Sequence, residues 1–184
     1  MRGRAAVAVL LLVAGFAAGS LAQGHADADA PAGYRTDNYR APVPATLDGA
    51  RVIDTQAAEG LWRERSAIFI DVLPRPVKPG NLPANMVWRE APHRSIPGAV
   101  WLANVGYGVV PEPLLQAFQA QLAMLTSGDP TRMLVFFCLK DCWMSWNAAK
   151  RAVSWGYSNV IWFPDGIDGW GDALLPLVDV APGF

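Results

Sequence analysis

Cysteine, histidine and net charge are all scarce in this 184-residue sequence. It holds two cysteines and two histidines, and 15 Lys and Arg residues nearly balance 16 Asp and Glu residues. No run of like charges stands out, which argues against nucleic acid or an anionic membrane surface as a partner, since both require a basic face. Low-complexity tracts and internal repeats are also missing. The length suffices for one domain with a proper core, but not for two of ordinary size.

The first 22 residues are expected to be a signal peptide rather than part of the fold. Arg2 and Arg4 give a positive start, residues 5–18 form an apolar stretch, and residues 20–22 read Ser-Leu-Ala, a small-x-small cleavage pattern. The stretch is short for a membrane span, although an uncleaved anchor is the alternative. We therefore expect a periplasmic protein, with no membrane association after cleavage. Thiols there face oxidising conditions, so two cysteines four positions apart raise the question of a disulfide.

The remainder predicts an extended arm followed by one α/β domain. Residues 23–46 are rich in Ala, Asp, Pro and Gly without periodicity, and their end, residues 34–44, is expected to lie against the domain. Residues 47–184 alternate strands with helices, which predicts a parallel sheet covered on both faces, with ligands at the carboxyl ends of the strands. The predicted strands span residues 51–54, 67–72, 99–102, 133–137 and 160–163, and the predicted helices span residues 55–65, 114–125 and 145–155. Thr55 is the expected N-cap of the first helix, and Gly156 the expected end of the last. The Pro-rich residues 74–92 predict no regular structure.

Both cysteines lie in one short loop between a strand and a helix. Cys138 directly follows the apolar strand 133–137, where turn amides and the helix dipole favour a negative charge and lower the pKa of a thiol. Lys140 adds a positive charge. The sequence therefore predicts Cys138 as a nucleophile and Cys142 as the resolving thiol, which attacks a sulfur carried by Cys138 and leaves a disulfide.

Three other interpretations of the loop stay open. The cysteines are inert small apolar residues, or a permanent structural disulfide, or a Cu(I) site with Met144 as third ligand. The candidate substrate-binding residues are Lys140, Asp141, Trp143, Met144 and Asp71. Asp71 ends a central strand, where it either orients the loop or caps a turn.

Neither a resident metal nor a cofactor is expected. His93 is interpreted as a surface loop residue of the Pro-rich segment. A metal role would need a second histidine nearby, and the only other one, His25, lies in the arm. Asp165 and Asp168 lie in a Gly-rich stretch, where Asp usually serves turn formation.

Three segments together resemble the rhodanese domain. They are Ile-Phe-Ile-Asp-Val at 68–72, Ser-Ile-Pro-Gly-Ala-Val at 95–100, and residues 156–170 with a closing Gly-Gly-x-x-x-Trp motif whose first Gly is replaced by Asp165. The resemblance implies a rhodanese-like, five-stranded α/β domain with Cys138 as catalytic cysteine of a sulfurtransferase. Departures are Leu73 in place of an Arg, Ser95 in place of a His, and no Arg closing the cysteine loop. An anionic donor would be held by loop amides and Lys140 alone, so an apolar or protein-borne partner fits better.

A second, closer resemblance covers nearly the whole mature chain. Residues 138–151, 96–102, 105–108 and 39–44 resemble the exported Cys–Cys–Trp motif family, which is associated with alcohol catabolism dependent on pyrroloquinoline quinone (PQQ). It implies a periplasmic accessory protein whose partners are quinoprotein dehydrogenase pathway proteins or a small sulfur donor. Two hypotheses follow: a sulfurtransferase or thiol–disulfide exchanger, and a non-catalytic accessory protein in which the disulfide is a structural clip.

Overall fold

A five-stranded parallel sheet forms the centre of the molecule. The computed structural model describes residues 29–83 and 85–184, so the predicted signal peptide lies outside the described residues. The strands run in the order β1-β6-β5-β2-β4, and every pairing is parallel. Their bounds are β1 (Ala50–Val52), β2 (Ile68–Asp71), β4 (Val100–Trp101), β5 (Leu134–Phe137) and β6 (Val160–Trp162). The predicted α/β class and five-stranded parallel sheet are confirmed.

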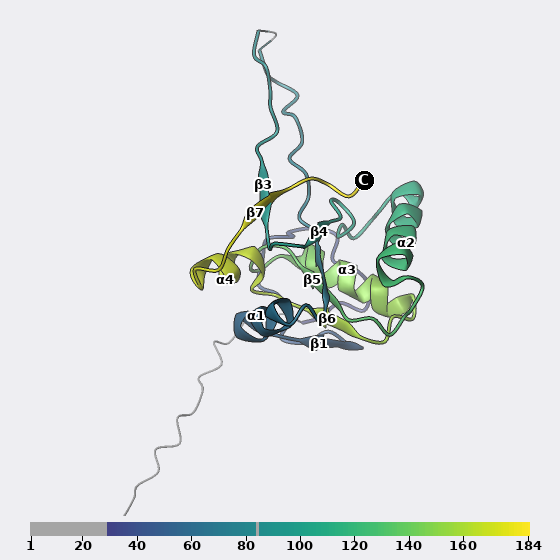
Figure 1. Ribbon diagram of the computed structural model, residues 1–184. Helices are drawn as coiled ribbons and strands as arrows, with labels where there is room; N and C mark the ends of the chain where they lie inside the picture. Colours follow the sequence, from purple (N-terminus) through teal and green to yellow (C-terminus); the bar gives the residue numbers. More distant parts are fainter. Residues whose placement is uncertain (1–28, 84) are drawn as a thin grey trace, which may run out of the picture.

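Helices cover both faces of this sheet (Figure 1). They are α1 (Thr55–Arg63), α2 (Glu112–Thr126), α3 (Trp143–Ser154) and α4 (Gly166–Asp172). Successive side chains of a strand point to opposite faces. In β2, Ile70 packs in one cluster with residues of α2 and α3, whereas Phe69 packs in the other with Ala58 of α1 and Trp170 of α4. The prediction of two covered faces is therefore confirmed.

The helix ends differ from expectation at two points. Asp54, not Thr55, caps α1, because the helix already includes Thr55 and the Asp54 carboxylate accepts an amide hydrogen bond of the first turn at 2.8 Å. Helix α3 begins at Trp143, two residues early, which makes Cys142 its N-cap. Gly156 ends α3 as predicted, with a φ of 91° that only glycine adopts readily.

Two features of the fold were not predicted. β3 (His93–Ser95) pairs antiparallel with β7 (Val178–Val180) near the C-terminus, so the interpretation of His93 as a surface loop residue is wrong. The Gly-rich stretch that was expected to be a turn forms α4. Both features depend on tertiary contacts rather than on local pattern, since His93 finds its strand partner 87 positions along the chain, at Val180.

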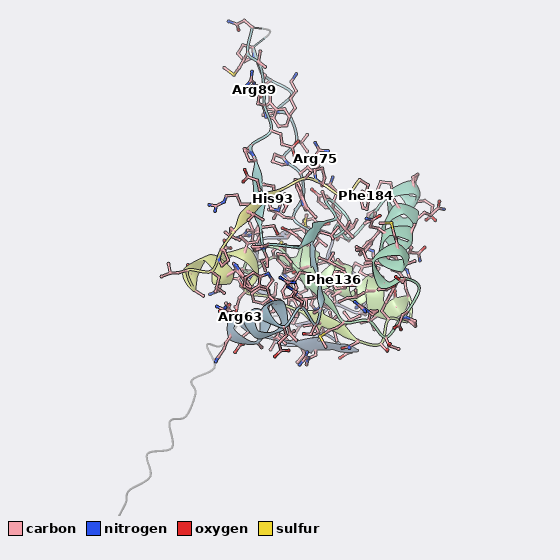
Figure 2. All side chains as sticks on the ribbon, viewed as in Figure 1. Arg63, Arg75, Arg89, His93, Phe136 and Phe184 are labelled. Carbon is pink, nitrogen blue, oxygen red and sulfur yellow. The ribbon has the colours of Figure 1, made fainter. Side chains whose placement is uncertain are left out.

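Between β2 and β3 the chain extends away from the domain. Residues 74–83 and 85–92, here called the insert, contain neither helix nor strand, as predicted, and rise as a narrow protrusion (Figure 1). His93, Arg75 and Arg89 mark its course from the base outward in Figure 2. No helix among the described residues is both long and apolar enough to cross a membrane.

Candidate active site

The cysteine loop leaves the carboxyl end of β5, where the sequence placed it. Cys138 follows the last residue of that strand, and its carbonyl accepts a hydrogen bond from the Ile167 amide at 2.8 Å. Any side chain on Gly166 would collide with the same carbonyl, and the φ of Gly166 is 54°. The start of α4 thus packs against the cysteine loop, and the contact between Gly166 and the Cys138 carbonyl requires glycine.

Both cysteines are free thiols, and both are buried. Cys138 is 0% exposed and Cys142 is 3% exposed. The Cys138 thiol donates to the Cys142 carbonyl at 3.5 Å, and each thiol influences the pKa of the other. A close thiol pair of this kind releases its first proton from whichever sulfur is better stabilised as a thiolate.

That better-stabilised sulfur belongs to Cys142. The hydrogen bond from Cys138 lowers the pKa of Cys142 to about 7, assisted by the amides of Met144 and Leu139 and by the charge of Arg40. Cys142 is also the N-cap of α3, where the helix dipole favours a negative charge. Burial raises the pKa of Cys138 well above its usual range. The sequence predicted the lowered pKa at Cys138, and the complete enclosure of that sulfur reverses the order.

Residues 29–46, here called the arm, lie over the cysteine loop. Arg40 and Cys142 form an antiparallel bridge. The flanking hydrogen bonds run from the Trp143 amide to the Tyr39 carbonyl at 2.9 Å and from the Ala41 amide to the Asp141 carbonyl at 3.1 Å. The arm therefore pairs with the loop like a short additional strand, and it lies against the domain as expected.

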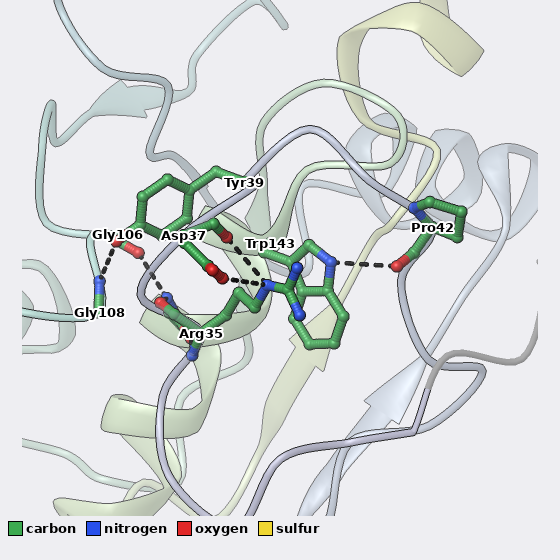
Figure 3. Close-up of polar contacts among 8 residues, drawn as sticks. Arg35, Asp37, Tyr39, Pro42, Gly106, Gly108 and Trp143 are labelled. Atoms are coloured by element: carbon green, nitrogen blue, oxygen red, sulfur yellow. Dashed lines mark hydrogen bonds and ion pairs between the residues drawn. The ribbon is translucent and has the colours of Figure 1, made fainter.

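Side chains of α3 hold the rest of the arm. The Trp143 indole donates to the Pro42 carbonyl at 3.0 Å, with the Arg35 guanidinium 5.2 Å from the centre of its ring (Figure 3). Asn147 binds both the amide and the carbonyl of Arg35, at 3.0 and 2.9 Å. Lys150 donates to three successive arm carbonyls at 2.9–3.0 Å. These bonds satisfy an irregular segment that cannot satisfy its own backbone.

The predicted substrate-binding residues of the loop fall into two groups. Trp143 and Met144 are 1% and 4% exposed, and they pack in the core beneath the arm. Lys140 is exposed, and its amide donates to Asp168 Oδ2 at 3.0 Å. Asp141 is half-buried, with a φ of 51° that shapes the turn. Lys140 and Asp141 are thus the members of this set that face solvent at the loop.

Asp71 lies elsewhere. Its side chain follows Phe69 onto the α1 and α4 face, whereas Cys138 packs with Ile70 on the opposite face. The fully buried carboxylate binds His93 Nε2 at 2.7 Å, accepts from Ser95 Oγ at 2.6 Å, and accepts from the Leu73 amide at 2.9 Å. Asp71 therefore fastens the two ends of the insert to the sheet, and none of these three partners belongs to the cysteine loop.

Two residues at the site escaped sequence reasoning. Arg40 belongs to the arm, and its proximity to Cys142 depends on a pairing across 102 positions of the chain. Asp168, expected to serve a turn, bridges the Lys140 amide and the Arg40 guanidinium, the latter at 3.9 Å. No group of three or more His, Cys, Asp or Glu side chains suited to a metal ion occurs in residues 29–83 and 85–184.

Comparison with known structures identifies the fold. A thiosulfate sulfurtransferase from Pseudomonas aeruginosa superposes with a TM-score of 0.50 at 17% identity, covering 72% of this chain and 21% of that one. A polysulfide-sulfur transferase homodimer from Wolinella succinogenes gives 0.43 at 16% identity, over 72% and 81% of the two chains. A human single-domain sulfurtransferase gives 0.41 at 20% identity, over 67% and 96%. The chain has a rhodanese-like fold, and the matched part spans about a fifth of the length of the Pseudomonas protein.

Sequence comparison adds nothing to this assignment. No protein-family description matches the chain, and neither does the sequence of any curated protein. At the identities of the structural neighbours the likeness concerns the fold alone. Any evidence on function therefore lies in the cysteine site itself.

Proposed function

We propose that this protein is a thiol-dependent sulfurtransferase in which Cys142 attacks and Cys138 is the second, resolving thiol. One arrangement carries the proposal: two buried thiols share one site, with the Cys138 thiol bound to the Cys142 carbonyl at 3.5 Å, and the pKa of Cys142 is lowered to about 7 while that of Cys138 is raised. Thiolate is the reactive form of cysteine, and Cys142 is partly thiolate at neutral pH. The rhodanese fold, whose neighbours include proteins named for sulfur transfer, supports the same chemistry.

The reaction balances with a persulfide donor, RS–SH. The Cys142 thiolate attacks the outer sulfur, forms a persulfide on Cys142 and expels the thiolate RS⁻. An acceptor thiolate then removes the outer sulfur and regenerates the Cys142 thiolate. In the absence of an acceptor, the Cys138 sulfur attacks Cys142 Sγ. The outer sulfur leaves as HS⁻ and takes the Cys138 proton, which gives hydrogen sulfide and a Cys138–Cys142 disulfide.

The setting that we propose is the periplasm, alongside PQQ-dependent alcohol dehydrogenation. The support is the resemblance of residues 138–151 to the exported Cys–Cys–Trp motif family, together with the leader-like start of the sequence. The partners would be proteins of that quinoprotein pathway or a small sulfur donor. This placement leads to a simple check: the mature protein, recovered from a periplasmic extract, should begin after residue 22.

Single-cysteine variants test the division of labour. Treated with glutathione persulfide, Cys138→Ser should retain an added sulfur on Cys142 that dithiothreitol removes, because the resolving thiol is gone. Cys142→Ser should retain none. The mass of the peptides that carry each cysteine is the measurement. A persulfide trapped on Cys138 in Cys142→Ser would reverse the assignment, and no adduct in either variant would refute sulfur transfer.

The burial of both thiols favours one alternative, a non-catalytic accessory protein with a structural disulfide. Cys138 and Cys142 are 0% and 3% exposed beneath the arm, as expected of a clip. A ring closed over four residues should contribute about 2 kcal/mol before strain. Under this alternative both serine variants lose similar stability, and neither traps an adduct.

A further inference from the structure

The pairing of the arm with the cysteine loop places one arm side chain next to Cys142. The hydrogen bonds on either side of the Arg40–Cys142 bridge join residue 143 to 39 and residue 41 to 141. This pattern makes Arg40 and Cys142 a non-hydrogen-bonded antiparallel pair, the type with the closer side chains, whose Cα atoms lie about 4.5 Å apart. Directly opposite residues also project to the same face of the ladder. The backbone alone thus directs the Arg40 side chain to the side of the Cys142 sulfur.

The guanidinium of Arg40 has only a weak ion pair, with Asp168, among the described residues. Its side chain is 54% exposed, and its ion-pair partner Asp168 lies 3.9 Å away with 45% exposure. An exposed pair at that distance is weak. Asp168 Oδ2 also accepts the Lys140 amide, so its charge is shared between loop and arm. Between Cys138 and Cys142 the loop carries two charged side chains, Lys140 and Asp141, which are of opposite sign.

The loop residues on either side of Cys142 carry no positive charge. Its last residues before and inside α3 are Cys142, Trp143 and Met144, and Trp143 is buried with its indole bound to the arm. The positive charge beside Cys142 therefore comes from a segment about 100 positions away. Across this short ladder the charge acts over a small distance, and because the Arg40 side chain is half-exposed, added salt screens it in part.

We propose that Arg40 is a positioning residue of the thiol site: the arm delivers its guanidinium to Cys142, where it stabilises the thiolate and stands next to negative charge on an incoming group. This inference rests on the proposed role of Cys142 as the attacking thiolate. It predicts that the arm is part of the reactive site. An intact arm that lacks the Arg40 charge should leave Cys142 less reactive.

The pH dependence of Cys142 alkylation by iodoacetamide tests the first half. Arg40→Gln should raise the midpoint by roughly half a unit to one unit, whereas Arg40→Lys should keep it close to that of the unsubstituted protein. Arg35→Gln is the matched control, since Arg35 lies in the same arm but over the Trp143 ring. It should leave the midpoint unchanged. Equal midpoints in the Gln and Lys variants, shifted or not, would overturn the inference.

A charged reagent tests the second half. The ratio of the alkylation rates by iodoacetate and iodoacetamide, measured at one pH, cancels both the thiolate fraction and any opening of the arm. Arg40→Gln should lower this ratio about threefold or more at low salt, and added salt should shrink the difference. An unchanged ratio would contradict the proposed contact with anions. If Cys142 fails to react in every variant, the proposed function falls as well; a normal Cys142 titration untouched by Arg40→Gln overturns this inference alone.

Discussion

The arm and the insert have similar compositions, but the arm packs against the domain and the insert does not. Both are irregular, both are rich in proline, and neither shows periodicity. Yet Val43 of the arm is 0% exposed, whereas Val77 and Val87 of the insert are 84% and 79% exposed. In Figure 1 the insert extends away from the domain, while the arm follows α3 closely enough for the contacts seen in Figure 3.

The difference lies in what each segment meets. Helix α3 presents indole, amide and ammonium donors to the arm, so the arm's carbonyls find partners within the protein. Along the described part of the insert, the Arg75 amide donates to Asn104 Oδ1 of the domain at 3.2 Å. Arg75 and Glu90 also form an exposed pair within the insert, whose hydrogen bonds lower the pKa of Glu90. Irregular backbone packs on a domain when the domain supplies the hydrogen-bond partners. Composition alone does not decide whether an irregular segment packs on the domain.

The base of the insert should be its strongest point and should give the largest effect. Asp71→Ala removes a buried carboxylate and leaves Ser95, His93 and the Leu73 amide without their acceptor. We expect a loss of about 4 kcal/mol in the free energy of unfolding, measured by urea denaturation. Asp54→Ala, which loses one exposed capping bond, is the control and should cost about 1 kcal/mol. Similar losses in the two variants would show that the base is no firmer than an exposed helix cap.

The attachment of the arm is tested by Asn147→Ala. The Asn147 side chain makes three hydrogen bonds, two to Arg35 and one to the Gly106 carbonyl, and it is buried. The variant should lose about 2–3 kcal/mol, because buried groups of both segments are left unpaired. Asn159→Ala, which removes a single exposed bond to the Thr131 carbonyl at 3.4 Å, should lose less than about 0.5 kcal/mol. A loss no greater than that of the control would mean that the arm is held loosely.

Loosening the arm without unfolding the domain gives a smaller but more specific effect. Trp143→Phe keeps an aromatic ring and removes the hydrogen bond to the Pro42 carbonyl. The expected loss in the free energy of unfolding is about 1 kcal/mol. Trp62→Phe removes an equivalent bond to the Pro97 carbonyl, far from the arm. Both should lose similar stability, but only Trp143→Phe should speed the alkylation of Cys142. Equal alkylation rates in the two variants would separate the arm from access to the thiols.

How far the sequence predicted this molecule depends on the range of the interactions. The strand at 134–137 and the helix at 112–126 follow local apolar patterns, and the position of Cys138 at a strand end follows from them. The lowered pKa at Cys142 could not be predicted, because it requires knowing that Cys138 is enclosed. β3 has three residues, too few for a period-two pattern, so its pairing with β7 and the Asp71–His93 contact left no local signal.

Helix α4 is a second case in which local sequence patterns do not predict the structure. Gly166, Gly169 and Gly171 disfavour a helix on propensity alone. Tertiary contacts override that preference: Trp170 is fully buried against the α1 face, and a side chain on Gly169 would meet Thr55 and Asp165. At Gly166 and Gly169 the Gly-rich pattern therefore marks tight packing, against the Cys138 carbonyl and against the Thr55 and Asp165 side chains, rather than the turn that was predicted.

The exposed apolar side chains of the insert should give the smallest effect of all. Replacing Val77, Met86 and Val87 together with serine removes three side chains that are 84%, 55% and 79% exposed. Because they bury little area, the free energy of unfolding should change by less than about 0.5 kcal/mol. Val43→Ser, a single apolar-to-polar change in the fully buried part of the arm, should cost about 2–3 kcal/mol. Urea denaturation of the two variants compares three residues of one irregular segment with one residue of the other. A larger loss from the triple variant would mean that the insert packs on the domain in solution, and the contrast between the two segments would then disappear.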